Sequence, residues 1–483
     1  MTIDLYTFPV DKQNNFIQRE VSISGQQWAK ECIALAQQIN SYSEENWLLY
    51  QDDFYQFSIN FFALLLADKN IVLAQSEQAE RLQQAAKFAD ITIGDRIITD
   101  SVSGESNQSQ PLAHFSPNKD CLVQDSTPIA LNINANTTIT LFTSGSTGDA
   151  KAIKKYWYQL ANEVECLEQL FPQALSPQQL TSEQSSCILS TVTHKHIYGL
   201  LFKLIWPVFT DKQIICETIE YPEQIEQYSQ NFTKLLLISS PSYLARTAQQ
   251  FSAQTMTKIQ RVFCSGGALS ANVADEIFSK YQQTITEVYG STETGGIAWR
   301  QQSKSVQWQL FPQHQVSLAK DDTLVLTSNF LAEGERYKTD DRVELNGRFF
   351  NLLGRVDRII KLHEKRLSLD EMESQLISLE NVNACHCFVL DTLQNKSALV
   401  AVIALKNNNA LPSDLSEKKL LINSCKKALL SVFEPSLLPR KWRFVAQLPF
   451  NSQGKLVKTE LVTLFNSSNK VHQYDLMSIC LNE

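Results

Sequence analysis

Between residues 185 and 290, short apolar runs alternate with segments of helical length, and this alternation is the strongest constraint on the fold. The runs, rich in apolar and β-branched residues, are CILST, QIICE, KLLLISS, RVFCSGG and TITEVYG. Neighbouring parallel strands need crossover connections of about a dozen or more residues, usually helices. The pattern therefore predicts a mostly parallel sheet with helices on its faces.

The pattern changes on both sides of this region. Residues 25–39 carry apolar side chains at helical spacing, which predicts an amphipathic helix. From residue 296 to 353, helical patterns give way to short runs that predict antiparallel strands, and strands and helices then mix again. We therefore expect an α/β fold. A large N-terminal domain, residues 1–353, has mostly parallel sheets and a β-rich subdomain, and a small α+β domain, residues 354–483, follows it.

Composition and charge limit the class of protein. The 483 residues carry a formal net charge of −8 and are 43% hydrophobic, which is ordinary for a soluble globular protein and unlike a nucleic-acid binder. The start, MTIDLYTFPVDKQNN, lacks the pattern of a secretory signal, and the apolar runs are too short to cross a bilayer. We expect a cytoplasmic protein with no nucleic-acid partner and no integral membrane segment.

Among the cysteines, only Cys385 and Cys387 lie close together, with His386 between them. A metal site is one interpretation, but no second ligand pair follows. Buried, reduced thiols on a strand are favoured.

The stretch LFTSGSTGDAKAIKK, Leu141 to Lys155, combines glycines, hydroxyls and a lysine after a predicted strand. Glycines let main-chain N–H groups approach a ligand closely, and hydroxyls and a lysine add donors and positive charge, which suits a phosphate chain. The spacing differs from that of a Walker loop. A flexible surface loop is the alternative. The candidate residues are Thr143, Ser144, Gly145, Ser146, Thr147, Gly148 and Lys151.

Two further motifs follow predicted strands. In EVYGSTETGG, Glu293 beside hydroxyls suits a Mg²⁺ ion that bridges phosphates, and the ring of Tyr289 suits stacking on a base. In RYKTDDRVEL, Asp340 and Asp341 precede a strand, and a carboxylate there suits the two hydroxyls of a ribose. A glycine-rich turn and a solvated turn are the respective alternatives.

The last two motifs lie towards the C-terminus. The stretch LLGRVDRIIKL lies at the expected boundary between the domains and suits a hinge. Lys455, in LPFNSQGKLVK, follows a glycine in a polar turn. Taken alone, such a lysine is most often a surface charge.

In this order, the five motifs resemble those of the adenylate-forming superfamily, which includes acyl- and aryl-CoA synthetases, peptide-synthetase adenylation domains and luciferases. TSGSTGDAK matches the signature T-S-G-[ST]-T-G-x-P-K at all but one position. YGSTE, YKTDD, GRVDRIIK and NSQGKLVK are similar to the motifs that follow in that superfamily. The resemblance spans about residues 137 to 460.

The resemblance implies a role for each matched residue. The implied ATP-binding residues are Thr143, Ser144, Gly145, Ser146, Thr147, Gly148, Lys151, Gly266, Gly267, Tyr289, Gly290, Asp341 and Arg355. The implied catalytic residues are Lys455, Thr292, Glu293 and His196, with Glu293 as the Mg²⁺ ligand. Asp357 is the implied hinge about which a mobile C-terminal domain rotates.

The reaction that the resemblance implies is the ATP-dependent activation of an aryl or acyl carboxylic acid to an acyl-adenylate, with release of pyrophosphate. The acyl group then passes to a phosphopantetheine thiol of CoA or of an acyl carrier protein. The implied cofactors are therefore ATP and Mg²⁺, with CoA or a 4′-phosphopantetheine carrier as co-substrate. A stand-alone amino-acid adenylation protein and a non-catalytic nucleotide-binding homologue are the alternatives, although the latter is disfavoured because Glu293 and Lys455 are both present.

Some positions depart from the superfamily pattern. Ala150 and Ala152 replace a proline and a glycine beyond the phosphate loop, and Asp340 replaces the glycine before Asp341. Glu364 stands where members that use CoA often have glycine, which leaves the choice between CoA and a carrier protein open.

Overall fold

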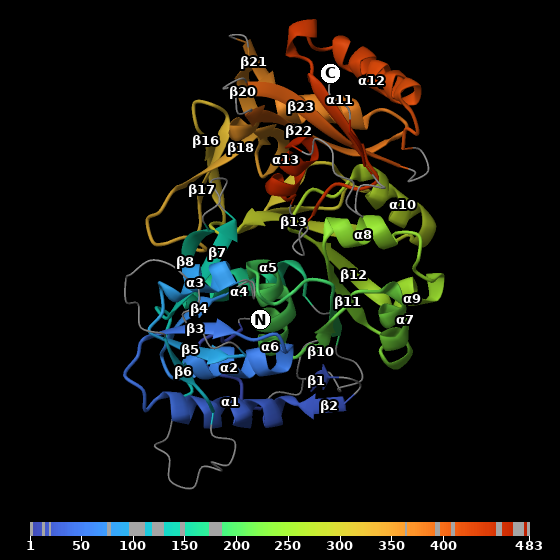
Figure 1. Cartoon of the computed structure of the whole chain (residues 1–483). Coiled ribbons are helices and arrows are strands. Elements are labelled where there is room, and N and C mark those ends of the chain that lie inside the picture. The colour runs from blue at the N-terminus through green and yellow to red at the C-terminus, as the bar shows by residue number, and fades with distance from the viewer. Residues whose placement is uncertain are drawn as a thin grey trace. The chain divides into compact units, whose positions relative to one another are not determined.

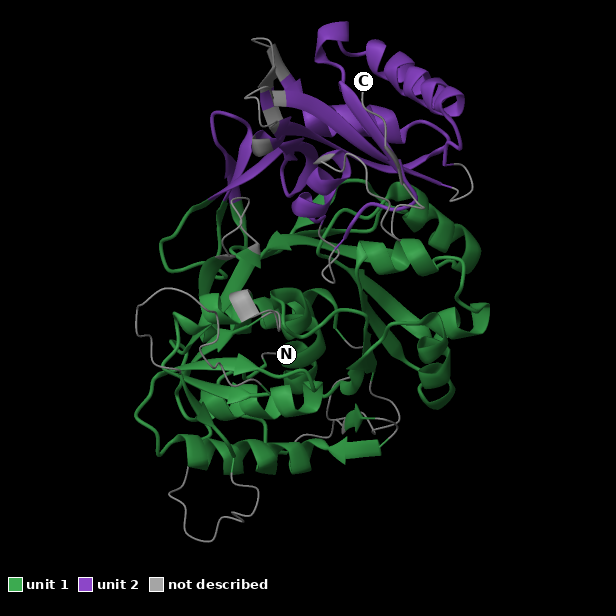
Figure 2. Ribbon diagram, viewed as in Figure 1, with its two compact units in different colours: residues 1–315, 326–337 green, residues 316–325, 338–483 purple. Residues whose placement is uncertain are grey.

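The computed structural model forms two compact units (Figures 1 and 2). Unit 1 comprises residues 1–315 and 326–337, and unit 2 comprises residues 316–325 and 338–483. These units reflect internal packing, and the predicted boundary between functional domains at residue 353 stays a prediction. The structure describes residues 3–11, 15–18, 21–74, 79–95, 112–117, 130–144, 150–172, 186–362, 365–391, 397–406, 411–450, 456–466 and 478–480.

Unit 1 contains the parallel sheet that the alternating pattern predicts. Its central strands lie in the order β10-β9-β11-β12-β13, and each pairs in parallel with its neighbour. Beyond β13 the sheet continues with β14 and β15, each antiparallel to the strand before it. Beyond β10, β1 pairs in parallel with β10, and β2 pairs antiparallel with β1. The strands are β1 (Asn15–Gln18), β2 (Val21–Ser24), β9 (Cys187–Ser190), β10 (Gln213–Thr218), β11 (Leu235–Ser239), β12 (Ile259–Cys264), β13 (Ile285–Ser291), β14 (Gly295–Arg300) and β15 (Trp308–Leu310).

A second sheet of unit 1 has six strands in the order β6-β5-β3-β4-β7-β8. All pair in parallel except β7 and β8, which form an antiparallel hairpin. Its strands are β3 (Asn46–Tyr50), β4 (Asn70–Leu73), β5 (Ile91–Gly94), β6 (Ala113–Phe115), β7 (Thr138–Ser144) and β8 (Ala150–Tyr156). The mixed α/β fold class expected from the sequence is thereby confirmed.

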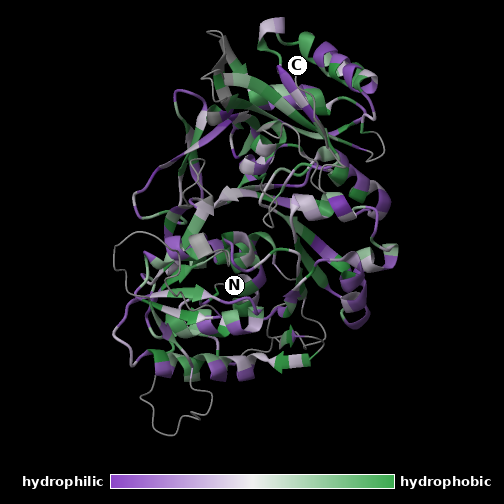
Figure 3. Cartoon of the chain, in the orientation of Figure 1, coloured by the Kyte–Doolittle hydropathy of each residue, from purple (hydrophilic) through white to green (hydrophobic). Residues whose placement is uncertain are grey.

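Helices complete unit 1. The α2 helix is mostly apolar and is almost wholly buried in a core that it shares with both sheets, as expected for a central helix. The α1 helix alternates hydrophobic and hydrophilic residues and buries only one side (Figure 3). The helices are α1 (Gly25–Ile39), α2 (Phe54–Leu66), α3 (Ala79–Ala86), α4 (Trp157–Leu170), α5 (Ile197–Gly199), the π-helix η2 (Leu200–Ile205), α6 (Trp206–Phe209), α7 (Pro222–Asn231), α8 (Pro241–Thr247), α9 (Ala253–Lys258) and α10 (Ala271–Tyr281).

Unit 2 contains antiparallel strands, then a small α+β arrangement. Strands β22 and β23 form its core hairpin, with β24 parallel to β23 and α11 and α12 packed nearby. Its helices are η3 (Val356–Arg358), α11 (Leu369–Ile377), α12 (Leu415–Leu430), η5 (Pro435–Leu437) and α13 (Lys458–Asn466). Its strands, some of which begin or end in unit 1, are β16 (Gln315–Leu318), β17 (Thr323–Thr327), β18 (Tyr337–Asn346), β19 (Phe349–Arg355), β20 (Ile359–Leu362), β21 (Lys365–Ser368), β22 (Val382–Asp391), β23 (Ser397–Leu405), β24 (Lys441–Val445) and β25 (Ser478–Cys480).

Cys385 and Cys387 are buried free thiols on one face of β22, the arrangement that the sequence favoured. In the part of the chain that the structure describes, no helix combines the length and apolar character needed to cross a bilayer.

Candidate active site

The predicted phosphate loop joins the strands of the β7–β8 hairpin. Thr143 pairs with Lys151 across this hairpin, and Ser144 pairs with Ala150. Side chains of directly opposed residues lie on the same face of a sheet, so the half-buried Thr143 and the exposed Lys151 share one face beside the loop. The rest of the predicted loop, Gly145, Ser146, Thr147 and Gly148, lies outside the described residues.

A tight turn between β13 and β14 carries Thr292 and Glu293, both half-buried. Within it, the Ser291 N–H donates to the Thr294 hydroxyl at 3.0 Å, and that hydroxyl donates to the Gly295 carbonyl at 2.8 Å. A Cβ atom on Gly290 would lie 2.1 Å from the Gly295 carbonyl oxygen. Only glycine at position 290 therefore lets β13 and β14 approach so closely at the turn.

Two buried charged residues, absent from the sequence predictions, support this turn. The Lys155 ammonium donates to the main-chain carbonyls of Glu293, at 2.5 Å, and Phe330, at 3.0 Å. The Glu163 carboxylate accepts from the Gly296 N–H at 2.7 Å. Both side chains are buried, Lys155 at 3% exposure and Glu163 at 4%.

Burial changes the acidity of both residues. It raises the pKa of Glu163 to about 7, although the Gly296 N–H and the charge of Lys155 act in the opposite direction. Burial also lowers the pKa of Lys155, and the nearby carboxylates Glu163, Glu335 and Glu293 counteract this.

Tyr289 and Gly266 lie on adjacent strand ends, where the resemblance implies an adenine site. The ring of Tyr289, half-buried on β13, lies 5.4 Å from that of Trp308 at a tilt of 51°. Gly266 and Gly267 follow β12 and are exposed, and Gly266 has a φ of +92°, which favours glycine. The hydroxyl of Ser265 donates to the Val288 carbonyl at 2.8 Å and thereby joins the two strand ends.

His196 is half-buried before α5, and its carbonyl accepts from the Leu200 N–H at 2.7 Å. The neighbouring His194 is fully buried instead, and its Nε2 lies 3.0 Å from the Gln51 carbonyl oxygen. Burial lowers the pKa of His194 to about 3, and the charge of Lys203 adds to this effect.

In unit 2, Asp341 and Arg355 face each other across β18 and β19. The Arg355 guanidinium lies 3.5 Å from the Asp341 carboxylate and donates to the Asp340 carboxylate at 3.2 Å. The additional negative charge of Asp340 is thus paired with Arg355.

Three further residues that the sequence singled out lie in the C-terminal part of the chain. Asp357 lies in the short η3 helix. Lys455 and Glu364 lie outside the described residues, so their predicted roles stay predictions.

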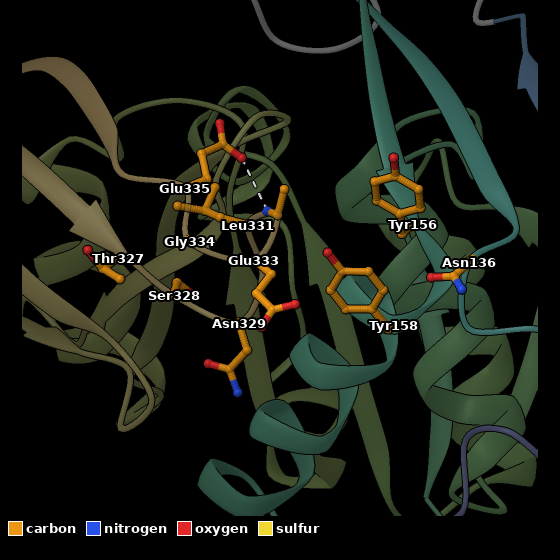
Figure 4. A pocket seen from close by; sticks show the side chains of 11 residues that line it. Asn136, Tyr156, Tyr158, Thr327, Ser328, Asn329, Leu331, Glu333, Gly334 and Glu335 are labelled. Carbon is orange, nitrogen blue, oxygen red and sulfur yellow. Dashed lines mark hydrogen bonds between the residues drawn. The ribbon is translucent and has the colours of Figure 1, made fainter.

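A cavity of about 900 Å³ opens on unit 1, between the end of β8 and the segment from Thr327 to Glu335 (Figure 4). The rings of Tyr156 and Tyr158 stack along its wall, 5.6 Å apart. Strand pairing places Tyr156 opposite Thr138, at the other end of the hairpin from the phosphate loop. None of the described residues predicted for the site lines this cavity.

The residues at the turn fit a Mg²⁺ ion held mainly by phosphates. The described residues contain no group of three or more histidine, cysteine or acidic side chains placed to hold a metal by themselves. Mg²⁺ at nucleotide sites needs only one or two protein carboxylates, because phosphates and water supply its other ligands. Glu293, half-buried in the turn next to Thr292 in the sequence, supplies one such carboxylate.

Solved structures share this fold over nearly the whole chain. ATP-bound MatB from Rhodopseudomonas palustris superimposes with a TM-score of 0.76 over 96% of this chain and 99% of its own, at 14% identity. O-succinylbenzoate coenzyme A synthetase (MenE) from Bacillus subtilis, in complex with AMP, superimposes with a TM-score of 0.73 over 94% of this chain and 96% of its own, also at 14% identity. These likenesses establish the fold.

Sequence comparison identifies the family. The D-alanine–D-alanyl carrier protein ligase of Staphylococcus aureus (strain bovine RF122 / ET3-1) is 24% identical over 362 residues, which cover 68% of this chain and 72% of that protein. The family model for AMP-binding enzymes matches residues 62–326, more than half of the chain. This chain therefore belongs to the AMP-binding enzyme family, within the adenylate-forming superfamily that its motifs resemble.

Proposed function

We propose that this chain is an AMP-forming acid–thiol ligase that activates an aryl or acyl carboxylic acid with ATP. One observation carries the proposal: unit 1 presents the β13–β14 turn with Thr292 and Glu293, and Tyr289 on the strand before it, on a fold shared with the AMP-binding family. The acyl group then passes to the phosphopantetheine thiol of CoA or of a carrier protein. The carrier protein ligases among the relatives support a carrier as partner.

The first half-reaction joins two anions. A carboxylate oxygen of the acid attacks the α-phosphorus of ATP, the bond from that phosphorus to the bridging oxygen breaks, and pyrophosphate leaves. Catalysis therefore depends on positioning and on neutralising negative charge. When bound, Mg²⁺ would neutralise phosphate charge, and Glu293 would hold it.

The chain's own groups have distinct parts in this step. Thr143 and Lys151, on one face of the hairpin, bind the β- and γ-phosphates together with the glycine-rich loop. The Thr292 hydroxyl donates a hydrogen bond to an oxygen of the α-phosphate, and Tyr289 packs on adenine. Lys455 bridges the acid and the α-phosphate.

The second half-reaction transfers the acyl group. The sulfur of the thiol attacks the carbonyl carbon of the acyl-adenylate, the bond to the AMP oxygen breaks, and the thiol proton is released. Asp341 and Arg355 hold the ribose. The C-terminal domain rotates about Asp357 between the first half-reaction and the second. His196 lies beside the acyl group.

Amino-acid activation is a second candidate. It is favoured by the names of the curated relatives, which are D-alanine ligases. In this case the acid site also needs a group that pairs with the ammonium of the substrate. For either candidate we propose a cytoplasmic location, which agrees with the buried, free thiols of the described cysteines.

Pyrophosphate release with ATP and Mg²⁺ tests the proposal across aryl, hydroxyaryl, medium-chain, long-chain and amino acids. We expect one acid class to release pyrophosphate and Lys455→Ala to abolish the release. Lys458→Ala is the matched control, because Lys458 is an exposed lysine at the start of α13. Nucleotide binding without release by any acid would contradict the ligase and favour a non-catalytic homologue. CoA and carrier protein are then compared as acceptors.

A further inference from the structure

The turn that carries Thr292 and Glu293 is fixed by side chains from elements distant in sequence. Lys155, on β8, is buried, and its ammonium binds the carbonyls of both Glu293 and Phe330. One lysine thus ties together three segments of unit 1: the hairpin, the turn and the 326–337 segment. Hydrogen bonds from a charged donor are stronger than those between neutral groups, especially where water is excluded.

Glu163 lies against the C-terminal end of the turn, next to Gly295 and Gly296. A Cβ atom on Gly295 would lie 2.4 Å from the Glu163 Oε2 atom, and Gly295 has a φ of +68°. The absent side chain therefore makes room for the carboxylate, which binds the Gly296 N–H. On the other side, His314 Nε2 lies 2.7 Å from the Gly296 carbonyl oxygen.

The main chain from Glu293 to Gly296 is thus bound by side chains at several successive groups. These are the Glu293 carbonyl by Lys155, the Gly295 carbonyl by Thr294, the Gly296 N–H by Glu163 and the Gly296 carbonyl by His314. Such a turn has little freedom to change its conformation.

The charge of Lys155 favours the ionised form of Glu163, but stability alone does not explain why both groups are buried. Burying a charged group costs free energy unless it is paired or hydrogen-bonded, and here both groups bind the main chain of the turn. Polar groups buried at this depth are better explained by the geometry that they impose, and here they contact the segment that carries the proposed Mg²⁺ ligand.

We propose that Lys155 and Glu163 are positioning residues that hold the Thr292–Glu293 turn in the geometry that binds the metal–nucleotide complex. This inference rests on the proposed function for the role of Glu293. The anchoring of the turn itself does not depend on that function.

Four variants test the proposal. Lys155→Met and Glu163→Leu remove the polar contacts at similar volume, whereas Glu163→Gln keeps an oxygen that accepts from the Gly296 N–H. Lys203→Met is the matched control. Lys203 is also fully buried, but it lies on the π-helix η2, away from the turn. Its ammonium also donates to main-chain carbonyls, those of Cys216 and Glu217 on β10.

Two measurements, neither of which uses turnover, apply to all four variants. Binding of Mn²⁺ in the presence of ATP is followed from the free Mn²⁺ signal by electron paramagnetic resonance. Hydrogen–deuterium exchange is followed for the peptide that covers residues 285–300. We expect Lys155→Met and Glu163→Leu to weaken Mn²⁺·ATP binding by about 10- to 100-fold, as for other supports of metal ligands. Exchange in that peptide should also become faster.

Glu163→Gln should restore affinity to within a few-fold of the wild type, and Lys203→Met should leave both measurements unchanged even if its melting temperature falls. If Lys155→Met and Glu163→Leu lower the melting temperature but leave affinity and exchange as in the wild type, the pair has only a structural role and the proposal is wrong. If the wild type does not bind Mn²⁺·ATP, the proposed function fails, and unchanged exchange in the variants would then also reject the anchoring.

Discussion

The Glu163 carboxylate accepts a hydrogen bond from the Gly296 N–H at 2.7 Å, and 4% of the residue is exposed to solvent. Because burial is the largest influence on this group, its pKa is raised to about 7. The groups that face it are Lys155 on β8 and the main chain of the turn, and Cys166 lies one helical turn further along α4. The stability of the fold therefore depends on whether Glu163 carries a proton.

Replacing Glu163 by glutamine should remove a pH dependence of stability. In the folded chain Glu163 keeps its proton up to about pH 7, whereas in the unfolded chain it loses it near its ordinary value of 4.5. The stability that the protonated Glu163 contributes to the fold is therefore complete below pH 4.5, and it is lost as the pH rises towards 7. From the two values, the free energy of unfolding of the wild type should fall relative to Glu163→Gln by roughly 3 kcal/mol over this interval. Urea denaturation at several pH values measures the difference, and parallel curves would contradict it.

His194 should have the opposite effect, in acid. Its folded pKa of about 3 is below the ordinary 6.5, because the ring is buried between Phe54 and Phe57, and Lys203 and Lys195 oppose its protonation while Asp52 favours it. Its contribution to stability is present above pH 6.5 and is lost as the pH falls towards 3. Between pH 6.5 and 3 the free energy of unfolding of the wild type should therefore fall by roughly 3–5 kcal/mol more than that of His194→Gln. Denaturant midpoints from pH 7 to 3.5 test this, and an identical acid dependence in both proteins would count against it.

The sequence predicted the family and the parallel strands because both depend on local patterns. Strands β9 to β13 are apolar runs between helix-length segments, and each motif is continuous along the chain. The supports of the turn carry no such signal. Lys155 follows Lys151 and Lys154 in a charged strand at the edge of a sheet, where lysine is usually solvated.

The burial of individual charged residues and histidines was the property that the sequence did not reveal. Within THKH, the letters do not distinguish the buried His194 from the half-buried His196. Glu163 is one of several acidic residues in a helix, and only tertiary packing places it beneath the turn. Asp340 departs from the superfamily pattern, and its partner Arg355 comes next to it only through the pairing of β18 with β19.

Asp340 and Asp341 should differ in their effect on ATP affinity. Asp340 forms an exposed pair with Arg355, and such pairs contribute about 0–1 kcal/mol. We therefore expect Asp340→Gly to change the KM for ATP by less than about threefold. Asp341→Asn removes the charge proposed to accept the ribose hydroxyls, and we expect a rise in KM of about tenfold or more, since hydrogen bonds to charged groups contribute about 1.5–3 kcal/mol. Pyrophosphate release at varied ATP measures both, and equal KM values for the two variants would count against the ribose assignment.

A single methyl group at position 290 should separate the strands that define the turn. In Gly290→Ala the new Cβ would lie 2.1 Å from the Gly295 carbonyl oxygen, which is main chain and has no side-chain freedom with which to move away. Such overpacking costs about 1–3 kcal/mol of unfolding free energy, and here the displaced atoms adjoin Thr292 and Glu293. We therefore expect the rate constant for pyrophosphate release to fall as well.

Gly347→Ala is the matched control for this substitution. Gly347 has a φ of +60°, but no described atom lies within 4 Å of an added Cβ. Its backbone strain alone should cost about 1 kcal/mol, with pyrophosphate release unchanged. Urea denaturation and initial rates on both variants separate the two effects. If Gly290→Ala loses stability but releases pyrophosphate as fast as Gly347→Ala, the close approach of β13 and β14 serves the fold and not the geometry of the turn.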